Sequence, residues 1–485
     1  MHARLIPIAA IVVAIASFGP PAVAQAPSMP PAPSMFSAAT LAACAKIRDA
    51  ALEDDYAYRR VADLADTIGP RLSGSPGAAA AVTYVQKQFQ ALGVTTRLQP
   101  IMVPHWVRGA EVAQLTAWPG QPQGLTQKVV VTALGSSPAT PQTGIEAPVV
   151  VVPDFAALAR LGQAGVAGKI VVFDEKFDVQ LAHDGLAGQA YGNAVAYRGR
   201  GPAEASKLGA VAALVRSVGS ADFRIAHAGQ TNFRDAKPIP AGAVAAEDAD
   251  KMARLSARGG VVRMRLILTP RTLPDAPSDN VIAEIPGREH PEQVVTIGGH
   301  LDAWDLGDGA IDDGAGVAIA METAQLLAHL QMHPRRTIRV VAFMNEENGT
   351  RGGLGYADAE KAKPQNQVAA IEADTGASHP LGIVVNVSPA GERALRPLMS
   401  VLAPIGATAI RRVDDSPETD IGPLSELGVP TIGLMQDDRH YFDYHHTAAD
   451  TLDKIVPREI AESSAVMAVV AYGLADADTT LPRVK

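Results

Sequence analysis

Residues 294–300 read VVTIGGH, a short apolar run that ends in an imidazole. Two later runs, TIRVVAFMNEE at 337–347 and VAAIEAD at 368–374, end in carboxylates. Between the first and the second of these three runs, the apolar residues of 314–330 recur at helical spacing. Short apolar runs that alternate with helical stretches are typical of a parallel sheet covered by helices on both faces. The sequence therefore predicts an α/β fold with a mixed, mostly parallel sheet flanked by helices.

Six side chains of types that bind metals or carry protons stand out, and most of them lie at or just beyond the ends of such runs. They are His300, Asp312, Glu346, Glu347, Asp374 and His446. A single Asp or His in a loop is usually only solvated. In open α/β sheets, however, ligands bind beyond the carboxyl ends of the strands, and several carboxylates crowded there repel one another unless cations compensate. We therefore expect a metal site at this edge of the sheet.

The ligand types narrow the choice of metal. Carboxylates mixed with imidazole, without a thiolate, suit Zn²⁺ with open catalytic positions, although manganese and cobalt remain alternatives on ligand type. The adjacent Glu346 and Glu347 fit such a site, since one can bind a metal while its neighbour takes a proton from the attacking water. Without the other residues, the Glu346-Glu347 pair would indicate only an acidic turn.

Five blocks of the sequence resemble the co-catalytic zinc exopeptidases, and most of all their carboxypeptidase Q-like branch. In order they are GHLDAWD at 299–305, GAIDDGAG at 309–316, NEENG at 345–349, EAD at 372–374 and HTAADT at 446–451. The resemblance covers essentially all of the chain after its N-terminal segment. It implies a zinc exopeptidase fold and hydrolysis of short peptides or dipeptides, with the choice among aminopeptidase, carboxypeptidase and dipeptidase open. It also implies a homodimer.

By position, the resemblance assigns five ligands to two zinc ions. They are the bridging Asp312, then His300 and Asp374 for one ion, and Glu347 and His446 for the other. Glu346 becomes the general base that later protonates the leaving amine. Asp302 becomes a carboxylate that accepts a hydrogen bond from His300; in the alternative, Asp302 is a turn or helix-start residue. The resemblance further implies a cis peptide bond after Asp312.

The second histidine ligand has a close competitor. His445 and His446 are adjacent, and either imidazole could bind metal. The His-Thr-x-x-Asp-Thr register favours His446. His445 would then be placed to hydrogen-bond the oxyanion of the tetrahedral intermediate.

A separate inserted domain is expected between two parts of the catalytic domain. Residues 131–272 contain short strand-like runs, such as PVVVV at 148–152 and KIVVFD at 169–174, and lack the pattern of metal-type residues at strand ends. This β-rich stretch resembles a protease-associated domain. We therefore predict catalytic parts at 37–130 and 273–485, separated by an insert at 131–272.

The N-terminus has the features of an export signal. Residues 1–24 combine Arg4, an apolar stretch and a small-x-small site at 22–24, and 25–36 reads as a proline-rich tether. The apolar stretch is shorter than the roughly 20 residues of a membrane-spanning helix; an uncleaved anchor is the alternative. We expect a secreted or periplasmic protein that is not membrane-bound after cleavage. The single cysteine, Cys44, permits no internal disulfide and is expected to be a buried structural thiol.

Composition limits the range of partners. The net charge of −9 gives no reason to expect nucleic acid, which needs a basic face. Two other functions are alternatives to a peptidase. A catalytically inactive binding ectodomain would have lost ligands, whereas all five positions are filled here. A glutaminyl-cyclase-like acyl transferase on a related single-zinc fold would have a reduced ligand set and no insert.

Overall fold

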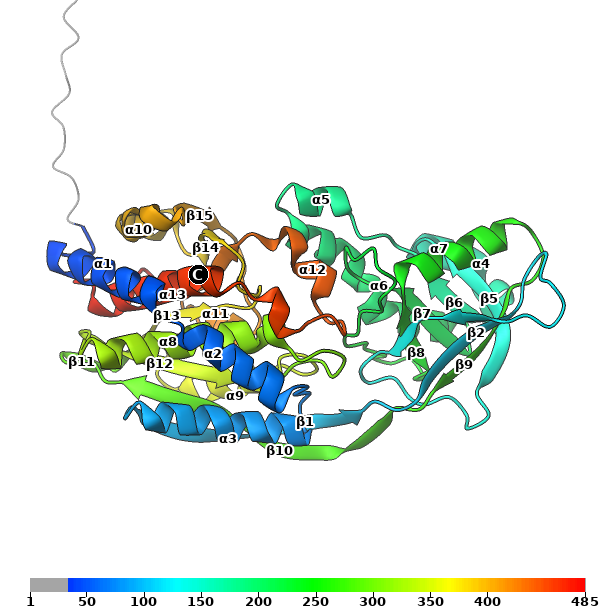
Figure 1. The fold of residues 1–485 in the computed structure, drawn as a ribbon, viewed down its shortest axis with the longest axis horizontal. Coiled ribbons are helices and arrows are strands. Elements are labelled where there is room, and N and C mark those ends of the chain that lie inside the picture. The colour runs from blue at the N-terminus through cyan, green and yellow to red at the C-terminus, as the bar shows by residue number, and fades with distance from the viewer. Residues whose placement is uncertain (1–33, 485) are drawn as a thin grey trace, which may run out of the picture. The chain divides into compact units, whose positions relative to one another are not determined.

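Two eight-stranded sheets organise residues 34–484, the part of the chain that this computed structural model describes (Figure 1). The strands of the first sheet are β1 (Thr95–Val107), β10 (Arg271–Ile285), β11 (His290–His300), β12 (Arg336–Phe343), β13 (Gln367–Glu372), β14 (Pro380–Asn386), β15 (Ala409–Arg412) and β16 (Thr431–Gln436). Their order in space is β1-β10-β12-β11-β13-β16-β14-β15. The four central strands run parallel, whereas β1, β10 and β14 pair in antiparallel fashion. The predicted mixed α/β fold is confirmed.

Helices cover both faces of this sheet. They are α1 (Ala38–Glu53), α2 (Tyr56–Ala62), α3 (Pro76–Ala91), α8 (Ala315–His329), α9 (Arg351–Glu360), α10 (Pro389–Leu402), α11 (Gly422–Glu426), α12 (Tyr441–Tyr444) and α13 (Pro457–Asp476). Successive residues of a strand point to opposite faces. Val281 of β10 accordingly packs into the main core with α8 and α13, while Ile282 packs with Tyr356 of α9 and Leu424 of α11. Helix α13 is buried from Ile460 to its end.

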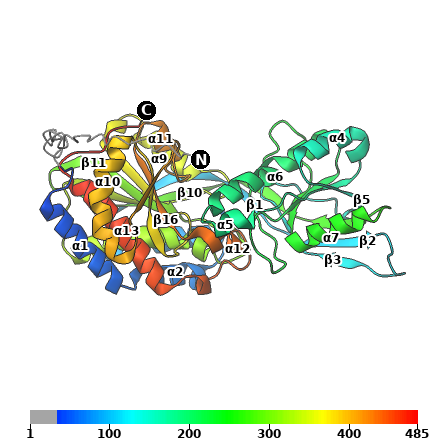
Figure 2. The same cartoon turned by 90° about the horizontal axis from the view of Figure 1, so that it is seen from above.

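The second sheet, with its own helices, lies at the far end of the β1–β10 ribbon (Figure 2). Its strands are β2 (Glu111–Ala117), β3 (Gln127–Val129), β4 (Val131–Ala133), β5 (Ile145–Val152), β6 (Ile170–Phe173), β7 (Ala212–Arg216), β8 (Ala241–Val244) and β9 (Arg263–Leu268). Its helices are α4 (Phe155–Val166), α5 (Val179–His183), α6 (Ala187–Lys207) and α7 (Ala246–Ala257). Both sheets belong to one compact unit that begins at Met35.

The second sheet begins earlier in the chain than the expected insert at 131–272. Strand β2 pairs with β9 and β3 pairs with β2, so the chain enters this sheet at Glu111. The region also holds more helix than its β-rich sequence suggested. Helix α6 contains four glycines, at 188, 192, 199 and 201, and Pro202. These residues lower helix propensity, and packing against the sheet overrides that preference.

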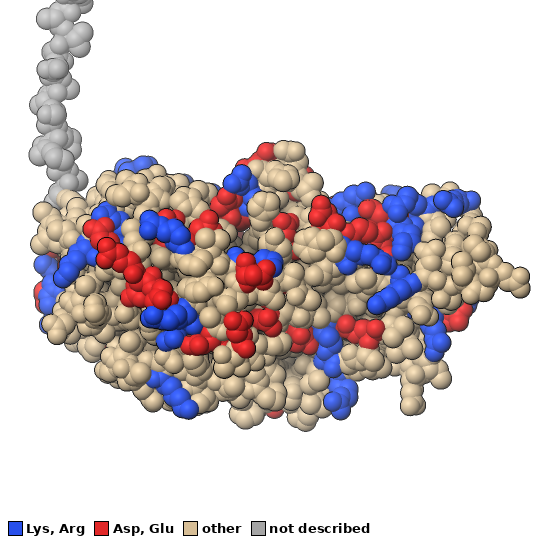
Figure 3. Space-filling view, viewed as in Figure 1, with Lys and Arg blue, Asp and Glu red and all other residues tan. Residues whose placement is uncertain are grey.

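The N-terminal expectations fall partly outside the described residues. The predicted signal sequence at 1–24 and most of the predicted tether at 25–36 lie there, whereas Met35 and Phe36 are buried in the main core. Cys44 of α1 is buried without a disulfide, and burial raises the pKa of its thiol to about 12. Within residues 34–484, no helix combines the length and apolarity needed to cross a bilayer. Figure 3 shows acidic and basic side chains interspersed on the face in view.

One buried carboxyl group makes the stability of the fold depend on pH. Glu322 of α8 is fully buried and accepts a hydrogen bond from the backbone N–H of Ala57, at 3.1 Å. Burial raises its pKa from 4.5 to about 8, and the neighbouring Asp54 adds to the rise. Below pH 4.5 the group is protonated in both the folded and the unfolded chain. As the pH rises from 4.5 to 8, the unfolded chain ionises first and the free energy of unfolding falls.

We predict that Glu322→Gln removes this pH dependence. Relative to the wild type, the variant should gain free energy of unfolding on the order of a few kcal/mol between pH 5 and pH 8.5. Urea unfolding at both pH values measures the difference. Glu53→Gln, at an exposed position of α1, is the control and should track the wild type. An equal pH dependence in wild type and Glu322→Gln would contradict the prediction.

Candidate metal centre

Neighbouring parallel strands end at one edge of the first sheet and deliver most of the predicted residues there. His300 is the last residue of β11 and lies opposite Phe343, the last residue of β12. Glu346 and Glu347 follow β12 within a few residues, and Asp374 follows the end of β13. The carboxyl ends of parallel strands are where α/β folds place their ligands.

The other two residues reach the same edge from loops. Asp312 lies in a short kinked segment, Ala310–Gly314, that leads into α8; its backbone is not helical, and the peptide bond from Asp312 to Asp313 is cis, as the resemblance implied. His446 follows α12 and has a left-handed backbone, with φ of 61°. All six predicted residues therefore lie at this edge of the sheet.

His300 directs one ring nitrogen at two carboxylates. Its Nδ1 lies 2.9 Å from the backbone carbonyl oxygen of Asp302, which can only accept, so Nδ1 carries the hydrogen. Its Nε2 lies 3.1 Å from Asp312 Oδ1 and 3.2 Å from Asp374 Oδ1. A neutral ring would thus present a lone pair to two anionic oxygens. That arrangement repels unless a cation or a proton lies between the atoms.

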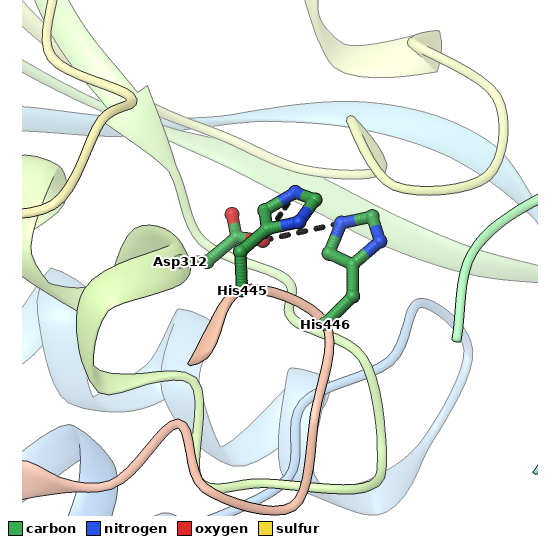
Figure 4. Close-up of side chains that lie close together, drawn as sticks. All are labelled: Asp312, His445 and His446. Carbon is green, nitrogen blue, oxygen red and sulfur yellow. Dashed lines mark ion pairs between the residues drawn. The ribbon is translucent and has the colours of Figure 1, made fainter. Parts of the chain in front are cut away.

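His446 repeats the pattern at the other oxygen of Asp312. Figure 4 shows His445 and His446 beside this carboxylate. Its Nδ1 lies 3.3 Å from the backbone carbonyl oxygen of Ala228. Its Nε2 lies 3.2 Å from Asp312 Oδ2 and 3.0 Å from Glu347 Oε2. His445 is stacked on His446, with ring centroids 3.6 Å apart, and its Nε2 lies 3.5 Å from the same Asp312 oxygen. Asp312 Oδ2 has no hydrogen-bond donor among the described residues.

The two oxygens of Asp312 therefore face two different groups of ligand atoms. Each group has its candidate atoms within 4.8 Å of one another, and the groups are His300, Asp312 and Asp374, and Asp312, His445 and His446. Glu347 adds its carboxylate to the second group through its contact with His446. Imidazole and carboxylate without thiolate is the donor set that catalytic zinc sites use.

The charges of the site also fit bound cations. Burial and the nearby Asp374 and Glu347 raise the pKa of Glu346 well above its usual range. Burial and Asp312 raise the pKa of Glu347 to about 7, although His446 opposes them. Burial would lower the pKa of His300, but Asp374 and Asp312 outweigh it and raise the value. The protein alone thus holds an excess of buried negative charge, which protons or metal ions must balance.

Asp302 acts differently from its expected role. Its backbone carbonyl, rather than its carboxylate, accepts from His300; the carboxylate Oδ1 is 3.9 Å from Nδ1. That oxygen instead accepts from the backbone N–H groups of Asn345, at 2.6 Å, and Glu346, at 3.0 Å, while Oδ2 accepts from Ser73 Oγ at 2.8 Å. The reason is the backbone of Asn345, whose φ of 78° turns these N–H groups toward Asp302. The carboxylate therefore positions the loop that carries Glu346 and Glu347.

Several supporting residues carried little or no signal in the sequence. Arg71 is fully buried and donates to the backbone carbonyls of Leu301, Asp308 and Gly309, at 2.9, 2.6 and 2.7 Å. Asp450 accepts from the backbone N–H of Ile311 at 2.7 Å. The HTAADT block contains Asp450, so its presence near the site was foreseeable. The part that Arg71 plays was not, because its partners are all backbone atoms.

The second sheet also contributes to the site. A cavity of about 240 Å³ is lined by Tyr191 and Arg198 of α6 together with residues from loops and short helices next to the first sheet: Asp312, Glu346, Glu347, Asp374, Thr375, Thr419, Tyr441, Phe442, His445 and His446. Two backbone hydrogen bonds join the second sheet's loops to the histidine loop, from Ser220 to Phe442 and from Ala228 to His446, at 3.1 and 2.8 Å. The wall that α6 forms could not be inferred from motifs.

Comparison with known proteins identifies the family. Residues 280–471 match the profile of Peptidase family M28. Carboxypeptidase Q of Bos taurus is 38% identical over 428 residues, which cover 88% of this chain and 86% of the relative. The chain belongs to peptidase family M28. As a member, and as a relative of the carboxypeptidase Q proteins, it is a zinc metallo-exopeptidase, a hydrolase of peptide bonds.

Solved structures agree with this assignment. The crystal structure of a peptidase M28 precursor from Shewanella amazonensis SB2B is 35% identical to this M28 peptidase, with a TM-score of 0.86 over 92% of this chain and 99% of that one. An aminopeptidase from Aneurinibacillus sp. strain AM-1 is 20% identical, with a TM-score of 0.60 over 89% of this chain and 95% of that one. At that identity the likeness concerns the fold alone.

We predict that Asp302→Ala weakens zinc binding. Loss of the carboxylate leaves the N–H groups of Asn345 and Glu346 without their acceptor, and supporting residues of this kind typically change metal affinity by about 10- to 100-fold. Competition with a chelator of known affinity measures the change. Ser73→Ala removes one hydrogen bond from the same carboxylate and should have a smaller effect. Unchanged affinity in a folded Asp302→Ala protein would refute this role.

Proposed function

We propose that this M28 peptidase is an exported di-zinc exopeptidase that hydrolyses short peptides. The observation that carries the proposal is the carboxylate of Asp312, whose two oxygens each face an imidazole and a second carboxylate. Such a carboxylate is suited to lie between two cations. Export is inferred from residues 1–24, and a homodimer from the family resemblance alone.

Five residues would hold the metal ions. Asp312 would contact both, with His300 and Asp374 on one side and Glu347 and His446 on the other. The carbonyls of Asp302 and Ala228 support this arrangement, because each accepts from Nδ1 and leaves Nε2 of the histidine free to bind. When bound, zinc polarises the scissile carbonyl and lowers the pKa of a nearby water.

Glu346 is proposed as the proton carrier. Its side chain lines the cavity beside Asp312 and Asp374, and its backbone is fixed by the carboxylate of Asp302. From this position the carboxylate would take a proton from the attacking water and give it to the leaving amine. The side chain is not fully buried, so solvent can restore the proton balance after each cycle.

His446 is proposed as the ligand and its neighbour as an oxyanion donor. His446 Nε2 contacts both Asp312 and Glu347, whereas His445 Nε2 lies 3.5 Å from Asp312 alone. Burial and the charge of His446 lower the pKa of His445, so its ring is neutral. A neutral imidazole in this cavity can donate one hydrogen bond to a tetrahedral oxygen.

The cavity favours small substrates. Its volume of about 240 Å³ is below the roughly 300–1,000 Å³ of pockets for drug-sized ligands. Helix α6 closes it with Tyr191 and Arg198. This wall is consistent with removal of terminal residues and with cleavage of dipeptides, and it leaves no room for a folded chain.

We predict that Glu346→Gln retains zinc and loses turnover by about 10²- to 10⁴-fold, because the amide cannot accept the proton. The rate at which alanyl-alanine releases free alanine measures activity, and elemental analysis measures the zinc content. Glu426→Gln, at an exposed position of α11, is the matched control and should retain activity. A fully active Glu346→Gln enzyme would remove Glu346 from the mechanism.

We further predict that the two adjacent histidines differ in metal binding. His446→Ala should lower the zinc content of the purified protein, because the second ion loses its imidazole. His445→Ala should keep full zinc content and lower kcat. Zinc per chain, measured after dialysis against metal-free buffer, separates the two. Retained zinc in His446→Ala together with lost zinc in His445→Ala would reverse the assignment.

A further inference from the structure

We propose that Arg198, supplied by helix α6 of the second sheet, binds the free carboxylate at the C-terminal end of the substrate. The inference rests on the proposed function and deepens it, since it selects peptides that are cleaved next to a free C-terminus. It assigns a substrate-recognition role to a residue outside the first sheet.

The guanidinium of Arg198 is buried and incompletely paired. The residue is 7% exposed. Its Nη2 donates to the hydroxyl of Tyr191 at 2.6 Å, and its Nη1 has two long contacts, 3.3 Å to the carbonyl of Ala228 and 3.4 Å to His446 Nδ1. Its Nε has no acceptor among the described residues. Arg198 also forms no ion pair with any described carboxylate, so its buried charge lacks a direct counter-ion.

Burying a cation without a partner is costly. A ligand anion that pairs with the guanidinium would offset this unfavourable free energy. Arg198 is the only Lys or Arg among the described residues that line the 240 Å³ cavity. The other ionisable residues there are two tyrosines and the carboxylates and imidazoles of the metal centre. An anionic substrate group entering this cavity therefore has one cation of the protein, besides any metal, with which to pair.

The position of Arg198 suits a carboxylate one residue away from the scissile bond. Its Nη1 lies 3.4 Å from His446 Nδ1, and the opposite nitrogen of that ring faces Asp312 and Glu347. The guanidinium is thus one imidazole ring away from the proposed metal ligands. A single extended residue spans about 3.3–3.6 Å, so the carboxylate of the leaving residue can reach the guanidinium while its amide lies at the metal centre.

Neighbouring contacts hold the guanidinium in place. The Tyr191 ring lies under it, with 5.4 Å from Arg198 Cζ to the ring centroid. Gly229 packs so close that a Cβ there would lie 2.4 Å from Cζ. A planar guanidinium fixed in this way can meet a carboxylate with two parallel hydrogen bonds.

The surroundings also give the substrate a direction. The small cavity shares Thr375 with a larger cleft of about 950 Å³. That cleft is lined by several acidic residues, including Asp414, Asp415 and Asp438. The amino-terminal part of a peptide, with its positive charge, fits the acidic cleft, and the terminal carboxylate fits the cavity that contains Arg198.

The test compares alanyl-alanine with alanyl-alaninamide, which lacks the terminal charge. The wild type should hydrolyse the free acid with the higher kcat/KM. Arg198→Met should lower kcat/KM for the acid by about tenfold to a hundredfold, the range expected for a lost charged hydrogen bond, and change it for the amide by less than about threefold. Arg200→Met, at an exposed position two residues along the same helix, is the matched control and should match the wild type with both substrates.

A merely structural role for Arg198 gives a different result. If the guanidinium only held Ala228 and His446 in place, Arg198→Met would lower kcat/KM for acid and amide alike, and the proposal would be overturned. Equal rates for the two substrates in the wild type would overturn it as well. Arg198→Lys, which keeps the charge and loses the planar fork, should retain part of the preference for the acid. Zinc content and melting temperature identify a variant that has not folded.

Binding separates this inference from the proposed function. Calorimetric titration of alanyl-alanine into zinc-loaded Glu346→Gln reports affinity without turnover. Introducing Arg198→Met into the Glu346→Gln protein should weaken that affinity by about tenfold or more. The amide should bind equally to the single and the double variant. Unchanged affinity for the acid would overturn the role of Arg198, even in an active peptidase. An Arg198-dependent affinity in a protein that hydrolyses neither substrate would uphold carboxylate binding and refute the peptidase function.

Discussion

The buried carboxylate of Asp312, held between two imidazoles, is the constraint on which the site depends. Such a group is tolerated only if the surrounding backbone fixes it and cations balance it. The backbone on either side of it is tied down, since Asp450 accepts from Ile311 and Asp313 accepts from the N–H of His300, at 2.7 and 2.9 Å. Arg71 stabilises the preceding loop by donating hydrogen bonds to backbone carbonyls of that loop. These contacts fix the spacing of the proposed ligands within the protein itself, so zinc would enter a preformed site.

The second sheet helps to build the site rather than being appended to it. The carbonyl of Ala228 sets the tautomer of His446, and the N–H of Ala228 donates a hydrogen bond to the backbone carbonyl of the same histidine. Helix α6 then closes the cavity with Tyr191 and Arg198. Movement of the second sheet would therefore disturb one histidine of the metal centre and the cavity wall together.

The first sheet, and the gathering of the proposed ligand residues at its edge, were predictable from the sequence because strand ends and short motifs carry them. VVTIGGH and VAAIEAD each place a ligand type directly after a strand, and topology brings these ends together. Features that depend on distant backbone atoms were not predictable. The carboxylate of Asp302 binds N–H groups of another loop instead of His300, and the glycine-rich sequence of α6 conceals the helix that supplies Arg198.

Anomalous diffraction from crystals of the zinc-loaded protein, collected on both sides of the zinc absorption edge, tests the central claim most directly. The account predicts two peaks, one on each side of the Asp312 carboxylate. One peak should be bounded by His300 and Asp374, and the other by Glu347 and His446. A single peak, or two peaks that do not both contact Asp312, would contradict it.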